Sequence, residues 1–259
     1  MIFKLTGGLG NQMFQYAYGR SWSIKNKKQF IYYYASNFGN TNRQCGIWRF
    51  NIKAKKIDGT LPEILRIIEK VVRIKNPHVL CGYWQGEKYF FDYKDEIRND
   101  FRLARPLDKK NLKFLNDIDK CNSVSIHIRR GDYVSDPKTI KIHGSCTLEY
   151  YKKAIEKIKK EVKRPVFFVF SDDPKWVRAN FKFGSIRYID WNKGINSYKD
   201  MELMSHCKHN IIANSSFSWW GAWLNNNPHK IVIAPKKWFN EIELQKEMKD
   251  LIPKKWIKL

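Results

Sequence analysis

Blocks of apolar and mixed sequence alternate along most of the chain and predict strands and helices in succession. Residues 1–6 form a short apolar run, a glycine loop follows at 7–10, residues 11–27 have helical periodicity and residues 29–34 form a second apolar run. This order predicts a β-α-β unit. Residues 60–72 begin with Thr-Leu-Pro-Glu and continue with apolar positions at helical spacing, which predicts a capped helix.

The second half alternates more regularly, after a predicted strand at 79–84 and mixed, charged sequence around 95–113. We predict strands at 123–129, 166–171, 185–189, 210–213 and 230–234, and helices at 148–162, 174–181, 198–207 and 218–225. Strands that alternate with helices imply a parallel sheet covered on both faces. We therefore expect an α/β fold in two domains, 1–118 and 119–259, with ligands at the carboxyl ends of the strands.

The glycine loop GGLGNQ at residues 7–12 lies between the first predicted strand and its helix. Backbone amides at such a position can approach a phosphate or a sugar closely. The loop is not the dinucleotide-binding fingerprint, because Met13 stands where the third glycine should be. Two interpretations stay open: a tight structural turn, or a site in which Gly8 and Gly10 bind a phosphate or sugar and Asn11 takes part in catalysis.

The segment SVSIHIRRGD at residues 123–132 carries the richest chemistry. A period of two puts its apolar side chains on one face of the strand and His127 and Arg129 on the other, with Arg130 and Asp132 in the turn beyond. A guanidinium group matches phosphate geometry bidentately. We interpret the segment as a phosphate site, and the alternative is a structural arginine–aspartate pair at the sheet edge.

Acidic residues follow two other predicted strands. Asp172 and Asp173 end the strand at 166–171 and precede a helix that Pro174 opens, so Asp173 is a natural N-cap. Asp200 lies three residues after Ser197, as in a capping box, so its simplest role is structural. Asp172 and Asp200 are also candidates for contacts with a nucleotide.

The segment NSSFSWWGAW at residues 214–223 follows the strand at 210–213 and opens a helix. Small hydroxyl residues and free amides at a helix N-terminus form an anion site, which makes Ser215 and Ser216 candidate ligand contacts. The three tryptophans of the segment are expected to pack the helix onto the sheet.

Composition narrows the function less than the motifs do. The formal net charge of +24 must attract anions, among them nucleic acid, acidic membrane and phosphorylated substrates. The lysine runs do not interleave with aromatic residues as in a nucleic-acid-binding module, so we expect no nucleic-acid partner. A sugar-binding module without activity is the other alternative.

The chain carries no sign of export or of metal binding. Its five cysteines are an odd number and lie far apart, so we expect reduced thiols. The one metal-like cluster, His206-Cys207-x-His209, lacks a second cluster, and we expect no metal. The sequence shows neither a membrane span nor a signal peptide, which predicts a cytoplasmic protein, and its charge suggests peripheral contact with an anionic inner membrane.

Three segments together, GGLGNQMFQYA, HIRRGDY and NSSFSWWGAWL, resemble the bacterial galactoside α-1,2-fucosyltransferases. The resemblance runs through essentially the whole chain and includes SDDP, DMELMSHCKHNIIANSS and IAPKKWF. HIRRGD also resembles a short motif of α-1,6- and protein O-fucosyltransferases.

This resemblance implies a GT-B-like fold, in which two Rossmann-like domains, acceptor-side 1–118 and donor-binding 119–259, face each other across a cleft. It implies a GDP-fucose donor, a galactose-terminated acceptor, inversion at the fucose anomeric carbon and no metal cofactor. By similarity, Arg129 would hold the donor phosphates and His127 would lie near the guanine. Asp200 would accept from the guanine, and Ser215 and Ser216 would face the diphosphate.

An inverting displacement also needs charge stabilisation on the leaving diphosphate and a base at the acceptor hydroxyl. Arg129, with Arg130, is the candidate for the first task. Asp132 is the candidate for the second, because it follows the arginines on the same turn. Asp132 has an alternative role as a salt-bridge partner that holds the guanidinium groups in place.

Overall fold

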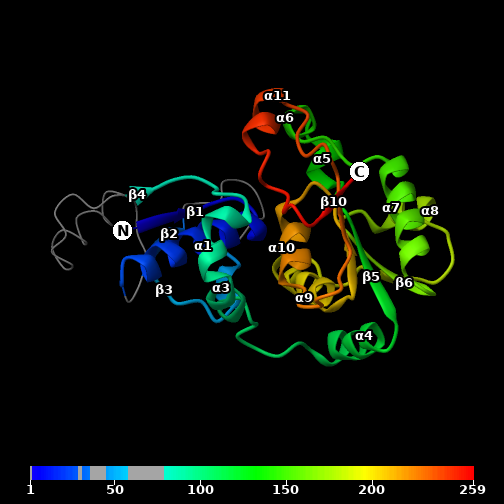
Figure 1. The fold of residues 1–259 in the computed structure, drawn as a ribbon, viewed down its shortest axis with the longest axis horizontal. Helices are drawn as coiled ribbons and strands as arrows, with labels where there is room; N and C mark the ends of the chain where they lie inside the picture. The colour runs from blue at the N-terminus through cyan, green and yellow to red at the C-terminus, as the bar shows by residue number, and fades with distance from the viewer. Residues whose placement is uncertain (1, 29–30, 36–44, 58–78) are drawn as a thin grey trace. The chain divides into compact units, whose positions relative to one another are not determined.

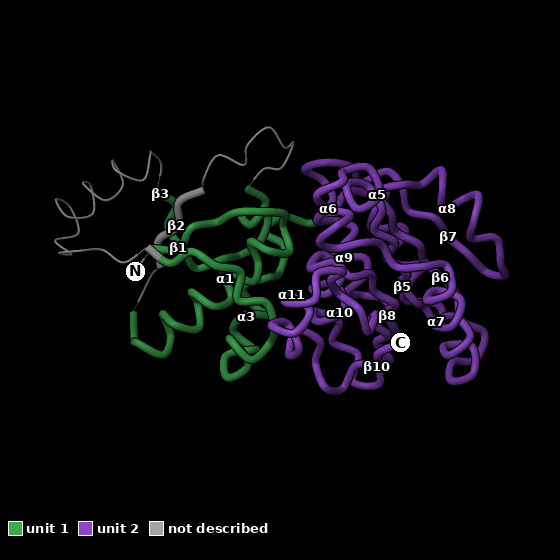
Figure 2. Tube along the Cα trace, turned by 90° about the horizontal axis from the view of Figure 1, so that it is seen from above, with its two compact units in different colours: residues 1–106 green, residues 107–259 purple. Residues whose placement is uncertain are grey.

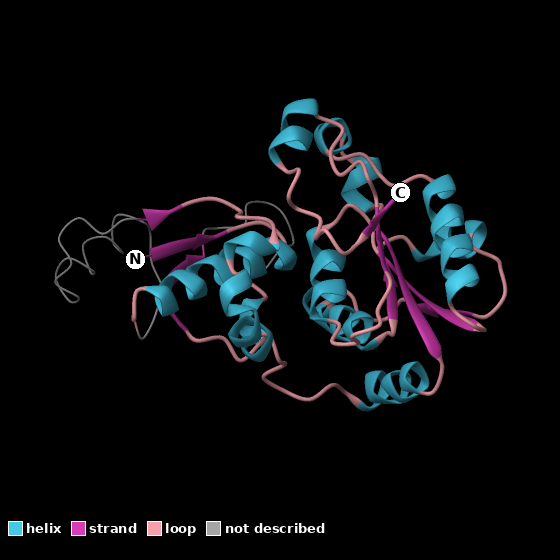
Figure 3. Cartoon of the chain, in the orientation of Figure 1, coloured by secondary structure: helices cyan, strands magenta, loops and turns pink. Residues whose placement is uncertain are grey.

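The computed structural model describes residues 2–28, 31–35, 45–57 and 79–259, and the predicted helix at 60–72 lies outside these ranges. The chain divides into two compact units, Met1–Pro106 and Leu107–Leu259 (Figure 2). In each unit, helices cover a sheet whose strands all run parallel (Figure 3). The expected α/β class with two Rossmann-like units is therefore confirmed, while the cleft between them stays a prediction.

Unit 1 holds a four-stranded sheet in the order β3-β2-β1-β4. Its strands are β1 (Ile2–Leu5), β2 (Ile31–Ala35), β3 (Ala54–Ile57) and β4 (Val79–Leu80). In the described part of this unit, the helices are α1 (Leu9–Lys25) and α3 (Lys94–Asp100), with 3-10 turns η1 (Ile47–Arg49), η3 (Glu87–Tyr89) and η4 (Phe91–Tyr93). The strand order changes direction between β1 and β4, so the loops after these two strands flank the change point of unit 1.

Helix α1 begins at Leu9, two residues before the predicted start, with Gly8 as its N-cap. Buried side-chain amides on its first two turns form hydrogen bonds with the surrounding loops. Gln15 accepts from the Thr6 amide at 3.0 Å and donates to the Gly82 carbonyl at 3.1 Å. Because its amide is paired in this way, Gln15 can be buried at little cost. Helix α1 is therefore buried at polar as well as apolar positions.

Unit 2 holds a six-stranded sheet in the order β10-β9-β8-β5-β6-β7, which is the strand order of a dinucleotide-binding Rossmann fold. Its strands are β5 (Asn122–Ile128), β6 (Pro165–Ser171), β7 (Ile186–Ile189), β8 (His209–Ile211), β9 (Val232–Ala234) and β10 (Ile257–Lys258). Its helices are α4 (Lys109–Asp119), α5 (Gly131–Ser135), α6 (Pro137–Ile142), α7 (Leu148–Glu161), α8 (Pro174–Asn180), α9 (Tyr198–His206), α10 (Ser216–Leu224) and α11 (Ile242–Glu247), and η5 (Gly194–Asn196) is a 3-10 turn.

The two faces of the unit 2 sheet differ in chemistry. Helices α7 and α8 cover one face, and α9 and α10 cover the other (Figure 1). The apolar side of β5 packs into the core under α7, whereas Ser125 on its other side accepts from buried Asn210 at 2.8 Å. The core residues from β5 are Val124, Ile126 and Ile128, as the period of two predicted. The sheet changes direction between β5 and β8, where a Rossmann sheet binds its ligands.

The unit boundary lies at 106/107, whereas the sequence predicted 118/119, because α4 packs on α9 and belongs to unit 2. Asn111 of α4 and Asn192 exchange two side-chain hydrogen bonds at 2.7 and 3.0 Å. The acceptor and donor roles of the two units stay predictions.

Other differences are local. Helix α10 begins at Ser216 rather than 218, and α3 to α6 had no counterpart among the predicted elements. All five cysteines are free thiols. In the ranges that the structure describes, no helix has the length and hydrophobicity to cross a bilayer.

Candidate active site

The carboxyl end of β5 gathers an arginine and two aspartates. The Arg129 guanidinium donates to Asp172 Oδ2 at 2.6 Å and makes a short contact with Asp132 Oδ1. The parallel register pairs Ile128 with Ser171, which brings the residues after β5 and β6 side by side. Arg129 is therefore held from two sides with its charge at the strand end, and the arginine–aspartate pair that was the structural alternative is present.

Arg130 is fixed by a separate set of contacts. Its backbone amide donates to Asp172 Oδ1 at 2.8 Å, and its Nε donates to Asp173 at 3.1 Å. Its guanidinium also stacks 3.8 Å over the Trp176 ring. Asp173 caps α8 by accepting from the Trp176 amide at 3.1 Å, so the predicted capping role is confirmed alongside the ion pair.

Gly131 lets the two loops approach this closely. A Cβ atom at this position would lie 2.5 Å from Asp172 Oδ2. A side chain here would displace the carboxylate that holds both Arg129 and the Arg130 amide. The glycine of HIRRGD thus serves the geometry of the charge cluster.

His127 lies buried beside this cluster in the neutral state. Burial, with a smaller contribution from the Arg129 charge, lowers its pKa to about 3. Its ring lies 5.5 Å from the Phe217 ring, and its Nδ1 has no hydrogen-bond partner in the part of the chain that the structure describes. An unpaired buried polar atom costs about 1–3 kcal/mol, so Nδ1 is well suited to a polar group of a ligand.

The N-terminus of α10 lies on the other side of the change point. Ser215 is the N-cap residue, but its hydroxyl makes no capping bond. The amides of the first turn, which begins at Ser216, have no carboxylate beside them on the helix. The Tyr133 hydroxyl donates to the backbone carbonyl of Asn214 at 3.3 Å. This bond links residues 129–133, the arginine turn, to the start of α10. With the parallel pairing of β5 and β8, this bond places Ser215 and Ser216 at the same end of the sheet as the two arginines.

Asp200 has a different environment from the predicted one. Ser197 makes no side-chain cap, so the expected capping box is wrong, because Ser197 already has helical backbone angles. Asp200 Oδ1 instead accepts from Asn192 Nδ2 at 2.7 Å. Burial and the nearby Asp190 charge raise the pKa of Asp200 to about 7, against the opposing hydrogen bond from Asn192. Asp200 belongs to α9, which packs along α10.

The candidates in unit 1 lie at its own change point. Gly8 caps α1, Gly10 lies in its first turn, and Asn11 Oδ1 accepts from Gln85 Nε2 at 2.8 Å. This bond joins the first turn of α1 to the loop after β4. The amides of Asn11 and Gln85 are neutral groups of the kind that pair with sugar hydroxyls.

Sequence reasoning missed several residues that shape the site. They act through contacts between separate helices, strands and loops that no local periodicity reveals, and they are Tyr133, Trp176, Asn192 and Phe217. Phe217 lies inside the NSSFSWWGAWL motif and Trp176 two residues after SDDP, so proximity to a motif was the available signal.

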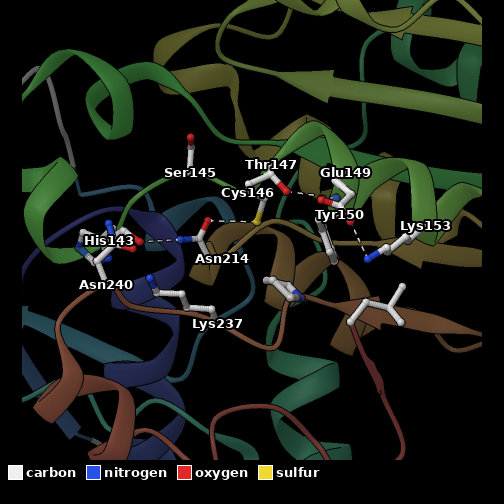
Figure 4. Close-up of a pocket in the computed structure, with 12 residues that line it drawn as sticks. His143, Ser145, Cys146, Thr147, Glu149, Tyr150, Lys153, Asn214, Lys237 and Asn240 are labelled. Carbon is white, nitrogen blue, oxygen red and sulfur yellow. Dashed lines mark hydrogen bonds and ion pairs between the residues drawn. The ribbon is translucent and has the colours of Figure 1, made fainter.

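A separate cavity of about 290 Å³ opens at the carboxyl ends of β8 and β9 on the α7 side (Figure 4). Asn214 stands between this cavity and the arginine turn. Its side-chain Nδ2 donates to the backbone carbonyls of His143, Gly144 and Trp238. Its own backbone carbonyl accepts from the Tyr133 hydroxyl. In the cavity, Lys153 is paired with Glu149 at 2.7 Å.

No group of His, Cys, Asp and Glu side chains among the described residues is arranged to hold a metal ion. The three members of the HCxH cluster have other partners. His206 pairs with Glu202 at 3.3 Å, Cys207 donates to the Leu203 carbonyl, and His209 Nδ1 accepts from the Ile231 amide at 3.0 Å.

Known proteins share both the fold and the sequence. A glycosyltransferase of family 9 from Veillonella parvula has the same fold, with a TM-score of 0.51 at 9% identity over 90% of this chain and 80% of its own. The chain is 38% identical to the alpha-1,2-colitosyltransferase of Escherichia coli over 100% of this chain and 98% of the relative. It is 33% identical to the O-antigen biosynthesis glycosyltransferase WbnK of the same species, over 92% and 95% of the two chains.

More distantly, a galactoside alpha-(1,2)-fucosyltransferase 1 of Bos taurus is 26% identical over 60% of this chain and 46% of its own length. The model of glycosyl transferase family 11 matches residues 2–259, nearly the whole chain. With the arginine cluster at the change point of a Rossmann sheet, this match shows that the chain is a glycosyltransferase that belongs to family 11.

Proposed function

We propose that the protein transfers L-fucose from GDP-β-L-fucose to the 2-hydroxyl of a galactose-terminated glycan, with inversion and formation of an α-1,2 linkage. The observation that carries the proposal is the arginine pair Arg129 and Arg130 at the carboxyl end of β5, which Tyr133 links to the start of α10, where Ser215 makes no side-chain cap. Such a cluster suits a diphosphate, and family membership supplies the nucleotide-sugar chemistry. The three fucosyltransferase-like motifs favour fucose.

The chemical problem is to stabilise the leaving diphosphate while its glycosidic bond breaks. In this proposal, Arg129 and the first-turn amides of α10, near Ser215 and Ser216, receive the charge that develops on the phosphate oxygens. Arg129 keeps its orientation because Asp132 and Asp172 grip it before the donor binds. Preorganised donors of this kind are worth about 2.7–4 kcal/mol each in other enzymes.

The nucleoside half of the donor is assigned to the α9–α10 face. Asp200 accepts from the N1 and N2 donors of guanine, which adenine lacks. His127 contributes an uncharged imidazole whose Nδ1 can bond to the nucleotide, since its low pKa keeps the ring neutral. The His127 ring is uncharged, and the Asp200 carboxylate accepts hydrogen bonds. Both therefore suit the polar groups of a base better than the negative charge of a phosphate.

The acceptor half is assigned to unit 1. Asn11 and Gln85 at its change point offer uncharged amides to the hydroxyls of a neutral sugar, and Gly8 and Gly10 are the glycines at the start of α1 beside them. Asp132 remains the candidate base for the galactose hydroxyl, although its contact with Arg129 supports the positioning role more directly. Peripheral contact with an anionic membrane stays a prediction from the net charge of +24.

The name of one relative favours a second donor sugar. Because that relative is an alpha-1,2-colitosyltransferase, colitose, which lacks the 3-hydroxyl of fucose, is the alternative. The decisive experiment offers GDP-fucose and GDP-colitose with galactose-terminated acceptors such as lactose, and determines the product linkage by NMR. We expect α-1,2-fucosylated product and none from an acceptor that lacks galactose. Transfer of colitose alone would correct the donor sugar, and a different linkage would overturn the acceptor assignment.

We also propose that the transfer needs no metal ion. The nearby carboxylates Asp132, Asp172 and Asp173 are each committed to an arginine, and those arginines supply the positive charge. Initial rates should therefore stay within about twofold after treatment with excess EDTA, since the charge-stabilising groups are part of the chain. Loss of activity that Mg²⁺ or Mn²⁺ restores would contradict this.

A further inference from the structure

We propose that Asn192 is a positioning residue for the donor: together with Asn111 it holds the Asp200 carboxylate in the orientation that reads the guanine base. The inference rests on the proposed function, in which Asp200 accepts from guanine. It adds two residues that determine specificity, Asn192 and Asn111, which lie outside the sequence motifs, and Asn111 belongs to α4.

The contact with Asp200 is direct and uses only one carboxylate oxygen. Asn192 Nδ2 donates to Asp200 Oδ1 at 2.7 Å. The structure gives Asp200 no further side-chain hydrogen bond among the described residues. Oδ2 is therefore the oxygen left for a base, and Asn192 determines where it points.

Asn192 cannot turn its amide freely, because Asn111 engages both ends of it. Asn192 Nδ2 donates to Asn111 Oδ1 at 2.7 Å, and Asn111 Nδ2 donates back to Asn192 Oδ1 at 3.0 Å. A flipped Asn192 amide would set its oxygen against the Asp200 carboxylate and break both bonds. Both asparagines are buried, so the cost of leaving these groups unpaired is high.

The ring of contacts closes on α9 itself. Asn111 Nδ2 donates to both carboxylate oxygens of Asp108, the N-cap of α4, at 2.9 and 3.1 Å. Asp108 in turn accepts from Lys199, the neighbour of Asp200, at 2.8 Å. Two sets of contacts thus hold the first turn of α9 to α4. One is the buried hydrogen-bond chain from Asp200 through Asn192 to Asn111, and the other is the ion pair of Lys199 with Asp108.

Few charges face Asp200. Asp190 destabilises its ionised form and is itself paired with Arg178 at 2.7 Å, while Lys199 is engaged by Asp108. Helix α10, which packs against α9, has no ionisable side chain. Asn192 is the group that favours the ionised carboxylate against burial.

This arrangement gives the positioning role a measurable signature. Asp200, whose pKa is about 7, accepts from guanine only when ionised, so the preference for GDP over ADP should grow as pH rises through that value. Removing the Asn192 hydrogen bond disfavours the ionised form, so the midpoint should move to higher pH. A purely structural role would weaken binding without moving the midpoint.

The experiment measures the dissociation constants of GDP and ADP for the full chain by calorimetry between pH 5.5 and 9. The ratio of the two constants is the readout, because titration of the diphosphate is common to both ligands and cancels. The variants are Asn192→Ala and the isosteric Asn192→Asp, which retains the shape but adds a like charge. Asp200→Asn serves as the reference for lost base reading, and Asn196→Ala, on the exposed η5 turn, is the matched control.

We expect the wild type and Asn196→Ala to share one midpoint near neutrality and a GDP preference of about tenfold or more above it. Asp200→Asn should flatten the profile, and both Asn192 variants should shift it to higher pH with a smaller preference at pH 7. Wild-type profiles in both Asn192 variants, with a flat profile in Asp200→Asn, would overturn the inference and leave the guanine donor standing. Equal affinity of the wild type for GDP and ADP would overturn both.

Discussion

Replacing Arg129 by lysine is expected to lower kcat/KM for the donor by about 100- to 1,000-fold, the usual effect of losing one preorganised charge-stabilising group. Lysine keeps the charge but loses the planar fork that Asp132 and Asp172 grip from two sides. Its ammonium has no parallel pair of N–H donors to bind a phosphate bidentately while the carboxylates are engaged. Steady-state kinetics with GDP-fucose and calorimetry with GDP measure the effect, and both turnover and affinity should fall.

The matched control is Arg187→Lys, the same substitution at an exposed position of β7 in the same sheet. Its kinetics should match those of the wild type. Wild-type kinetics in Arg129→Lys as well would place Arg129 outside the site and remove the main support for the proposed function.

Asp132→Asn tests the second carboxylate of the cluster. Because Asp132 contacts the Arg129 guanidinium, the neutral amide should loosen Arg129, and we expect kcat/KM to fall by about 10- to 100-fold with weaker GDP binding. The same two measurements decide between its roles. A fall in turnover with GDP affinity intact would instead identify Asp132 as the base that deprotonates the acceptor.

Because Asp132 contacts the Arg129 guanidinium, the second outcome would require Arg129 to turn away from Asp132 when the donor binds. Near wild-type turnover would exclude both roles. Asp172 and Asp173, which pair with Arg129 and Arg130, would then be the next carboxylates to replace.

The period of two in SVSIHIRRGD was enough to predict the strand, its buried face and the side on which His127 lies, because alternation follows directly from strand geometry. The burial of the tryptophans in α10 and the cap at Asp173 were predictable for similar local reasons. In each case the cause lies within a few residues of the effect.

The environment of Asp200 could not be predicted in this way. Ser197 and Asp200 have capping-box spacing, but the partner of Asp200 is Asn192, which in turn depends on Asn111, 81 residues away in the chain. Contacts at such separations depend on how the helices pack, which a single sequence does not reveal. The same long-range contacts place α4 in unit 2 and shift the unit boundary from the predicted position.

The place of α4 has a consequence for chimeric enzymes built by exchanging unit 2 between relatives. A junction at residue 119 would combine Asp108 and Asn111 from one parent with Asn192 and Lys199 from the other. The nucleotide preference of such a chimera would then depend on residues from both parents. A junction before Leu107 keeps the whole ring of contacts in one parental segment, so the donor preference should pass intact with that segment.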